Sequence, residues 1–224
     1  MKLSLPLLLL FFLPGLFLSG CSLSPYSERA IKPIWLQQNV HESWQQSHRY
    51  FIGFPEPSAF SVCHDLSCHS VSNTYFSAAE WQQIQSLFRA DTDSAHEERK
   101  QIQQAVALME TLVGDKIGTR NDLAQNALRG SRIGQLDCID EATNTSVYLR
   151  MMETQGLLQW HRAAPRTSRG IFIGRAPHNT ATIVELSTGN RFAVDAWYFD
   201  NGEPPAIVPL SSWKQGWQPG TVEN

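Results

Sequence analysis

The chain changes from helical to strand-like sequence patterns at Gly156, and this order constrains the fold more than any other feature. Before this glycine, Ser77 and Ser94 each stand three residues ahead of a glutamate and begin an amphipathic run, which predicts two capped helices. A third predicted helix runs from Asp137 to Gly156. After Gly156 come short strand-like segments: LLQWHRA, GIFIG, HNTATIVEL, RFAVDAWYF and PPAIVPL. Helices followed by antiparallel strands predict an α+β fold.

Three details of this pattern are specific enough to check. Gly114 stands where the C-terminal glycine of the second helix is expected, and HRYFIGF (48–54) is typical of a first strand. The segment STGN (187–190) predicts the turn of a hairpin. Centring the hairpin on that turn puts Asp195 opposite about Thr182.

The N-terminus has the pattern of an export signal. Lys2 precedes an apolar run that is too short to span a bilayer and ends in LSGC, Leu18–Cys21. In bacterial lipoproteins the signal is removed before such a cysteine, so we expect residues 1–20 to be cleaved and Cys21 to carry acyl chains such as palmitate. An uncleaved anchor helix is the alternative. Ser22, where an inner-membrane retention signal has aspartate, favours the outer membrane, with the protein facing the periplasm.

The expected mature chain divides into three parts. Residues 21–45 form a tether, residues 46–130 a helical N-terminal part, and residues 131–224 a catalytic core. Loss of Lys2 leaves 17 basic against 21 acidic residues, a formal net charge of −4. This charge is too small and of the wrong sign to favour nucleic-acid binding, so the expected partners are the membrane and a protein or peptide substrate.

Cysteine usage fits an oxidising compartment. Cys63 and Cys68 lie five residues apart in VCHDLSCH, and we expect them to form a disulfide. A metal site from Cys63, His64, Cys68 and His69, or covalent haem on the same segment, is the alternative. The disulfide leaves Cys138 without a partner, which calls for an explanation in an exported protein.

A set of three residues, Cys138, His178 and Asp195, explains why Cys138 is left unpaired. Cys138 lies in the first turn of a predicted helix, where unpaired N–H groups favour an anion. His178 opens a strand, and Asp195 follows seventeen residues later in the next strand. Such an aspartate can orient a histidine that activates the thiol, and Asp200 is the substitute for Asp195. No strand aspartate follows His161 at a suitable interval, so a structural role is expected there.

The segment DCIDEA, with these spacings, resembles the transglutaminase-like and papain-like cysteine enzymes and, among them, the exported bacterial transglutaminase-like cysteine proteinases. The resemblance covers residues 134–200 and implies a papain/transglutaminase-like core. It also implies Cys138 as nucleophile, His178 as general base and acid, and Asp195 as the orienting carboxylate. The Cys138 N–H and the Gln135 side chain are candidate oxyanion donors.

Calcium is the one cofactor that the resemblance suggests. Some of these proteinases bind calcium through acidic residues beside the cysteine, which here implies Asp137, Asp140 and Glu141. The presence of Ile139 directly after the cysteine departs from the family's calcium pattern.

The resulting hypothesis is a lipid-anchored periplasmic cysteine hydrolase or acyltransferase that acts on a protein or peptide amide. A cell-wall endopeptidase is one alternative, although such enzymes usually have Ser-Gly after the cysteine and a second histidine. A non-catalytic envelope lipoprotein is the other. It would bind a protein or the cell wall through aromatic side chains such as Trp197, Trp213 and Trp217.

Overall fold

The computed structural model describes residues 51–88, 92–126, 133–170 and 177–221, all within the compact unit Lys32–Asn224. The expected signal, Cys21 and the tether lie outside the described residues, as does most of the segment GIFIG. None of the described helices is both long enough and apolar enough to cross a membrane.

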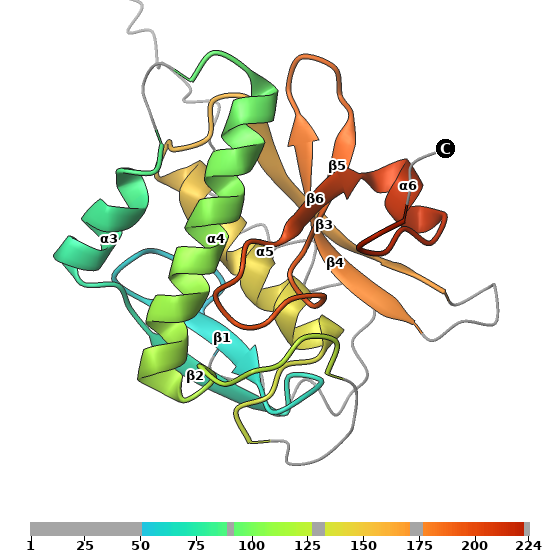
Figure 1. Ribbon diagram of the computed structural model, residues 1–224. Coiled ribbons are helices and arrows are strands. Elements are labelled where there is room, and N and C mark those ends of the chain that lie inside the picture. The colour runs from blue at the N-terminus through green and yellow to red at the C-terminus, as the bar shows by residue number, and fades with distance from the viewer. Residues whose placement is uncertain (1–50, 89–91, 127–132, 171–176, 222–224) are drawn as a thin grey trace, which may run out of the picture. The chain divides into compact units, whose positions relative to one another are not determined.

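The described chain forms helices and two antiparallel sheets, which confirms the α+β class (Figure 1). A two-stranded sheet pairs β1 with β2, and a four-stranded sheet has the order β3-β4-β5-β6. In chain order the elements are β1 (Phe60–His64), β2 (Ser70–Thr74), α3 (Ala78–Gln85), α4 (Ala95–Ile117), α5 (Cys138–Thr154), β3 (His161–Arg169), β4 (His178–Glu185), β5 (Arg191–Asp195), β6 (Ala206–Pro209) and α6 (Leu210–Lys214).

Helix α5 is the central element of the fold. It contacts the β1–β2 hairpin, strands β3 and β4, and helix α4 (Figure 1). Every residue from Asp140 to Leu149 is buried, so the helix is covered on all sides and not only along one apolar stripe. Its buried polar side chains are accommodated by local bonds; Asn144, for example, bonds to both backbone groups of Cys63.

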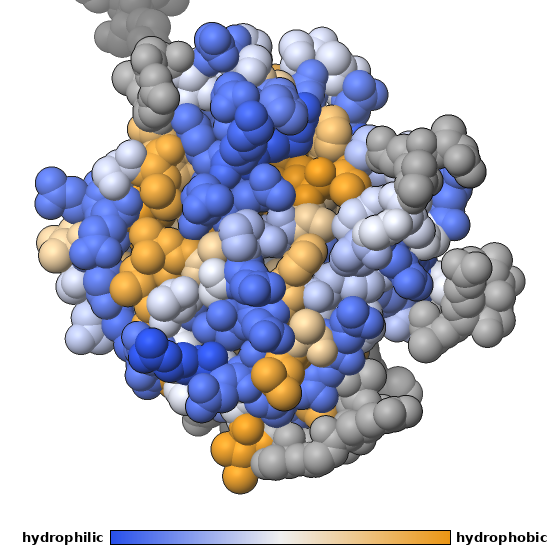
Figure 2. All heavy atoms as spheres, in the orientation of Figure 1, coloured by the Kyte–Doolittle hydropathy of each residue, from blue (hydrophilic) through white to orange (hydrophobic). Residues whose placement is uncertain are grey.

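One hydrophobic core joins the two halves of the described chain. It includes Phe60 from β1, Met109 from α4, Leu149 from α5 and Ile183 from β4. The core therefore continues across the expected boundary between residues 130 and 131. Helix α4 turns its polar face outward, and Figure 2 shows mostly hydrophilic side chains along it.

The predicted helix starts agree with the structure, but one predicted end does not. Ser77 and Glu80 form a capping box at α3, and the Ser94 side chain accepts a hydrogen bond from the Glu97 N–H at α4. Gly114 does not end α4, because the helix continues to Ile117 and Gly118 takes the left-handed conformation with φ of 86°. Gly114 instead allows a close approach, since a Cβ there would lie 3.0 Å from the Arg120 Cα.

The prediction of a strand at HRYFIGF is wrong for its described residues, 51–54, which belong to no strand. The first hairpin is β1–β2, in which Cys63 lies opposite Val71. Its connection contains four consecutive non-glycine residues with positive φ, from Asp65 to Cys68. No glycine signals this turn, so the sequence pattern did not predict it.

Candidate functional site

Strands β4 and β5 bring His178 and Asp195 together. His178 begins β4 and Asp195 ends β5, and His178 Nε2 lies 2.7 Å from Asp195 Oδ2. The register, with Ala181 opposite Val194, makes Asp195 level with Thr180, so the predicted pairing with Thr182 is wrong. The two residues are therefore diagonal neighbours on one face of the sheet, close enough for their side chains to meet.

The turn explains the difference in register. The Glu185 N–H donates to Asn190 O at 2.8 Å, and the Gly189 N–H donates to Glu185 O at 2.9 Å. Gly189 has a φ of 72°, which a glycine adopts readily. The hairpin is therefore centred one residue earlier than the expected position between Thr188 and Gly189.

Cys138 lies at the N-terminus of α5, next to the same histidine. Its thiol is partly exposed and interacts with His178, and Asn179 Nδ2 lies 3.6 Å from Sγ. Asp195 occupies Nε2 of the imidazole, so the other ring nitrogen, Nδ1, is left for the thiol. The structure thus brings Cys138, His178 and Asp195 into one connected set.

The charge state of His178 follows from its surroundings. Burial by itself would lower its pKa, but hydrogen bonding of the imidazole to Asp195 and Cys138, together with the negative charges of both groups, raises the pKa to about 9. The imidazolium is therefore the stable form at neutral pH. A histidine in this state favours the thiolate form of a neighbouring cysteine.

Aromatic side chains enclose the imidazole. The ring centroids of Trp197, Tyr198 and Trp213 lie 4.7, 5.4 and 5.5 Å from that of His178. Trp213 is fully buried, and its Nε1 donates to Asp195 Oδ2 at 2.6 Å. Trp197 and Trp213 thus pack against the histidine, and Trp213 also supplies a hydrogen bond that orients the carboxylate.

The acidic residues around Cys138 build the start of the helix. Asp137 is the N-cap and accepts from the N–H groups of Ile139 and Asp140, while Asp140 accepts from the N–H of Asp137. The second Asp137 oxygen accepts from Ser67 Oγ at 2.8 Å, and Asp140 Oδ1 accepts from the Cys68 N–H at 2.5 Å. Burial, together with the charge of Asp137, raises the pKa of Asp140 to about 8.

These contacts do not suit a calcium ion at Asp137, Asp140 and Glu141. The oxygens of Asp137 and Asp140 already accept hydrogen bonds from backbone N–H and hydroxyl groups. A carboxyl with a raised pKa, as at Asp140, is a poor ligand for a hard cation. Glu141 interacts with Glu110 on α4, and its raised pKa reflects burial and the charge of that neighbour. The three carboxyl groups fit capping and burial better than shared coordination.

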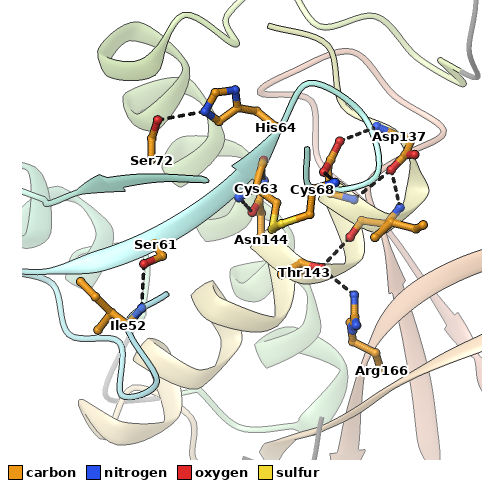
Figure 3. The surroundings of a disulfide bond; sticks show 12 residues. Ile52, Ser61, Cys63, His64, Cys68, Ser72, Asp137, Thr143, Asn144 and Arg166 are labelled. Carbon is orange, nitrogen blue, oxygen red and sulfur yellow. Dashed lines mark hydrogen bonds between the residues drawn. A yellow bond between two sulfur atoms is a disulfide. The ribbon is translucent and has the colours of Figure 1, made fainter. Parts of the chain in front are cut away.

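Cys63 and Cys68 form a disulfide in the structure (Figure 3). Among the described residues, the only three potential ligand atoms of Cys, His, Asp or Glu that lie close enough to hold a metal are those of Cys63, Cys68 and Asp140. Two of these atoms are the bonded sulfurs, which are not available as thiolate ligands. The same bond removes both cysteines as attachment points for haem.

The disulfide loop also contacts the segment before Cys138. The Asp65 N–H donates to Gln135 O at 3.0 Å, and the Gly134 N–H donates to Asp65 Oδ1 at 2.8 Å. With the bonds to Asp137 and Asp140, the loop holds the backbone on both sides of the N-cap. A segment distant in sequence thus helps to set the position of the thiol.

Gln135 lies near Cys138, but its side chain has other partners. Its Nε2 donates to Asn121 O at 3.0 Å, and its Oε1 accepts from Asn126 Nδ2. A role as oxyanion donor would require the bond to Asn121 to be exchanged. The cap uses the N–H groups of Ile139 and Asp140 and not that of Cys138, which keeps the Cys138 N–H as a donor.

Two other candidate residues have structural partners. His161 is buried, with Nδ1 2.8 Å from Glu98 Oε1 and Nε2 3.1 Å from Arg99 Nη1, so it links β3 to α4. Asp200, the substitute for Asp195, accepts from the Ala124 N–H at 2.7 Å. These contacts agree with the structural role expected for His161.

A group of buried carboxyls lies behind the site. Glu110 and Glu141 are buried, and each has one side-chain oxygen without a hydrogen-bond partner among the described residues. Burial raises the pKa of Glu110 to about 8 and that of Asp122 to about 7. Asp122 nonetheless accepts from the Leu136 N–H at 2.6 Å and so supports the loop before Cys138.

Sequence reasoning missed three residues of the site. Asn179 donates to the thiol, Trp213 donates to Asp195, and Arg166 lies close enough to Cys138 for their charges to interact. Asn179 directly follows the predicted histidine, which was the one available signal. The sequence suggested Trp213 only as part of an aromatic binding surface and gave no signal for Arg166, because their positions depend on the docking of α6 and on the register of β3.

Comparisons with protein-family models, with curated proteins and with solved structures found no match for this chain.

Proposed function

We propose that the protein is a thiol-dependent hydrolase or acyltransferase that acts on a protein or peptide amide. The observation that carries this proposal is the connected set of Cys138, His178 and Asp195, with the thiol at a helix N-terminus. A buried cysteine with a packing role would not need a charged imidazole beside it, nor a carboxylate behind that imidazole.

Each residue has a defined role in the proposed chemistry. The Cys138 thiolate attacks the carbonyl carbon, and the Cys138 N–H stabilises the oxyanion. The His178 imidazolium then gives its proton to the leaving amine as the C–N bond breaks, which produces a thioester. Water or a second amine, activated by neutral His178, attacks the thioester and releases the acyl group. Asp195 orients the imidazole throughout.

The fold supports the same proposal at a coarser level. A cysteine at the start of a buried helix, packed against an antiparallel sheet that supplies histidine and then aspartate, is similar to the papain/transglutaminase-like arrangement.

The cellular context is proposed from the sequence alone. LSGC at Leu18–Cys21 supports a lipid attached to Cys21 and an outer-membrane protein that faces the periplasm.

Exposure of envelope proteins to the enzyme tests this function. We expect the wild-type protein to generate new protein N-termini, or to attach a labelled amine, when incubated with an envelope extract, as read by mass spectrometry. Cys138→Ala, His178→Ala and Asp195→Asn should each abolish these products while keeping a cooperative unfolding transition. Products that persist in Cys138→Ala would end the proposal.

A further inference from the structure

Strand β3, which packs against the helix that begins with Cys138, contains a bulge. Ala164 lies opposite Thr182 and Thr167 lies opposite Thr180, so Pro165 and Arg166 together face a single residue of β4. Pro165 O accepts from Thr182 Oγ1 at 2.8 Å and from Arg191 Nη2 at 3.0 Å, which holds the bulge in place. Bulges of this kind redirect a side chain, here Arg166.

The redirected side chain crosses to α5. Arg166 Nη1 donates to Thr143 Oγ1 at 2.6 Å, and Thr143 Oγ1 donates to Ile139 O at 2.6 Å (Figure 3). The guanidinium thus lies against the first turns of the helix that begins with Cys138. Burial lowers the pKa of Arg166, and the negative charge of the Cys138 thiolate opposes this effect.

Arg166 has no carboxylate partner within the part of the chain that the structure describes. The ion pairs found there use other arginines and lysines, such as Arg99 with Glu185. Arg169 on the same strand also lacks an acid, but it donates to the Tyr198 hydroxyl at 2.5 Å and covers the ring of Trp213. Arg166 has only the neutral Thr143 hydroxyl as a hydrogen-bond partner there. A partly buried guanidinium with so few partners is costly unless an anion joins it.

We propose that Arg166 binds a carboxylate of the substrate next to the scissile amide. This inference rests on the proposed thiol chemistry, and it names the class of substrate. In the free protein, Cys138 is the group whose negative charge interacts with Arg166. Acylation forms the C–S bond and removes the negative charge of the Cys138 sulfur. A substrate carboxylate would then neutralise the positive charge of Arg166 for as long as the thioester exists. The preferred substrate therefore carries an acidic side chain or a free terminal carboxylate close to the attacked carbonyl.

Two alkylating reagents of similar size test this without a known substrate. Iodoacetate carries a carboxylate and iodoacetamide is neutral. The rate of Cys138 alkylation by each is measured on the purified full-length protein by mass spectrometry, and the ratio of the two rates is divided by the same ratio for N-acetylcysteine. We expect iodoacetate to be favoured about ten-fold in the wild type, and this preference to be lost in Arg166→Gln and partly kept in Arg166→Lys. Arg162→Gln, an exposed position on the same strand, is the matched control and should keep the ratio.

The outcomes separate the inference from the function on which it rests. If Cys138 reacts slowly with both reagents, the proposed function fails. If it reacts rapidly with both and Arg166→Gln leaves the normalised ratio unchanged, only the role of Arg166 is overturned. Two peptides identify the source of the carboxylate. A blocked peptide with an internal glutamate and an alanine peptide with a free C-terminus are compared for protection of Cys138 in the wild type and in Arg166→Gln.

Discussion

His178 and Asp195 are bonded at 2.7 Å although neither is opposite the other in the hairpin that carries them. Their diagonal placement leaves space at Asp195 Oδ2 for a second donor, Trp213 Nε1 at 2.6 Å. The carboxylate is thus fixed from two directions, by a strand neighbour and by a residue of α6.

Asp195→Asn should lower the pKa of His178, because it removes the negative charge and replaces the carboxylate acceptor with a weaker amide oxygen, and both carboxylate effects raise this pKa to about 9. The wild-type imidazolium is kept up to about pH 9, so its contribution to stability is present below the unfolded histidine pKa and is lost as the pH rises through about 9. NMR titration of the His178 ring protons measures the shift. Trp213→Phe is the control, since it keeps the charge; an unchanged His178 pKa in Asp195→Asn would refute the assignment.

Substitutions of the two buried histidines, His161 and His178, should have different effects on stability and on Cys138 reactivity. His161→Ala should lower the free energy of unfolding by about 2 kcal/mol, because it leaves Glu98 and Arg99 without their shared partner. Its Cys138 alkylation rate should match the wild type at temperatures where the variant is folded. His178→Ala should instead cause a large loss of the Cys138 alkylation rate. Equal effects of both substitutions on the rate would contradict the structural role of His161.

The pH dependence of stability should reflect Glu110, whose buried carboxyl group lies on α4. The unfolded chain releases the Glu110 proton near pH 4.5, whereas burial keeps it bound to about pH 8 in the folded protein. The folded state therefore binds more protons in this window, and the free energy of unfolding should fall as the pH rises from about 5 to 8. Glu110→Gln should reduce the slope and stabilise the protein at pH 8 by at least about 1 kcal/mol. Denaturant unfolding at several pH values measures this, with exposed Glu203→Gln as control; an unaltered slope in Glu110→Gln would count against the raised pKa.

The disulfide should affect both the stability of the fold and the reactivity of the Cys138 thiol. Replacing Cys63 and Cys68 by serine should cost about 2 kcal/mol of unfolding free energy, as expected for closing so short a loop. It should also slow Cys138 alkylation, because the loop bonds to Gly134, Gln135 and the cap residues of α5. Ser67→Ala removes only the exposed bond to Asp137 and should have a small effect. A less stable double variant with wild-type alkylation would show that the loop does not position the thiol.

Local sequence signals predicted much of this fold. The capping serines and the strand segments were visible because each depends on neighbours within a few residues, whereas Cys138, His178 and Asp195 were visible through their order along the chain. The register of β4 and β5 was not, since a four-residue loop with Gly189 in the left-handed region replaced the expected turn. The turn from Asp65 to Cys68 was also hidden, because a tertiary bond to Asp140 and the disulfide stabilise it.

The parts of the site that sequence could not supply come from distant elements. Trp213 reaches Asp195 from α6, and Arg166 reaches α5 through a bulge. Gly114 has the sequence signal of a helix end, but it allows close packing against Arg120 and against the distant Asn201. In each case a long-range contact overrides the local pattern.

The most direct test of the central claim is the rate of Cys138 alkylation by iodoacetamide as a function of pH, with His178→Ala beside the wild type. The account predicts rapid labelling already at about pH 6, where an ordinary thiol with a pKa of about 8.5 reacts slowly, and a marked loss of that rate in His178→Ala. Slow labelling at this pH that the histidine substitution leaves unchanged would show that Cys138 is an inert cysteine.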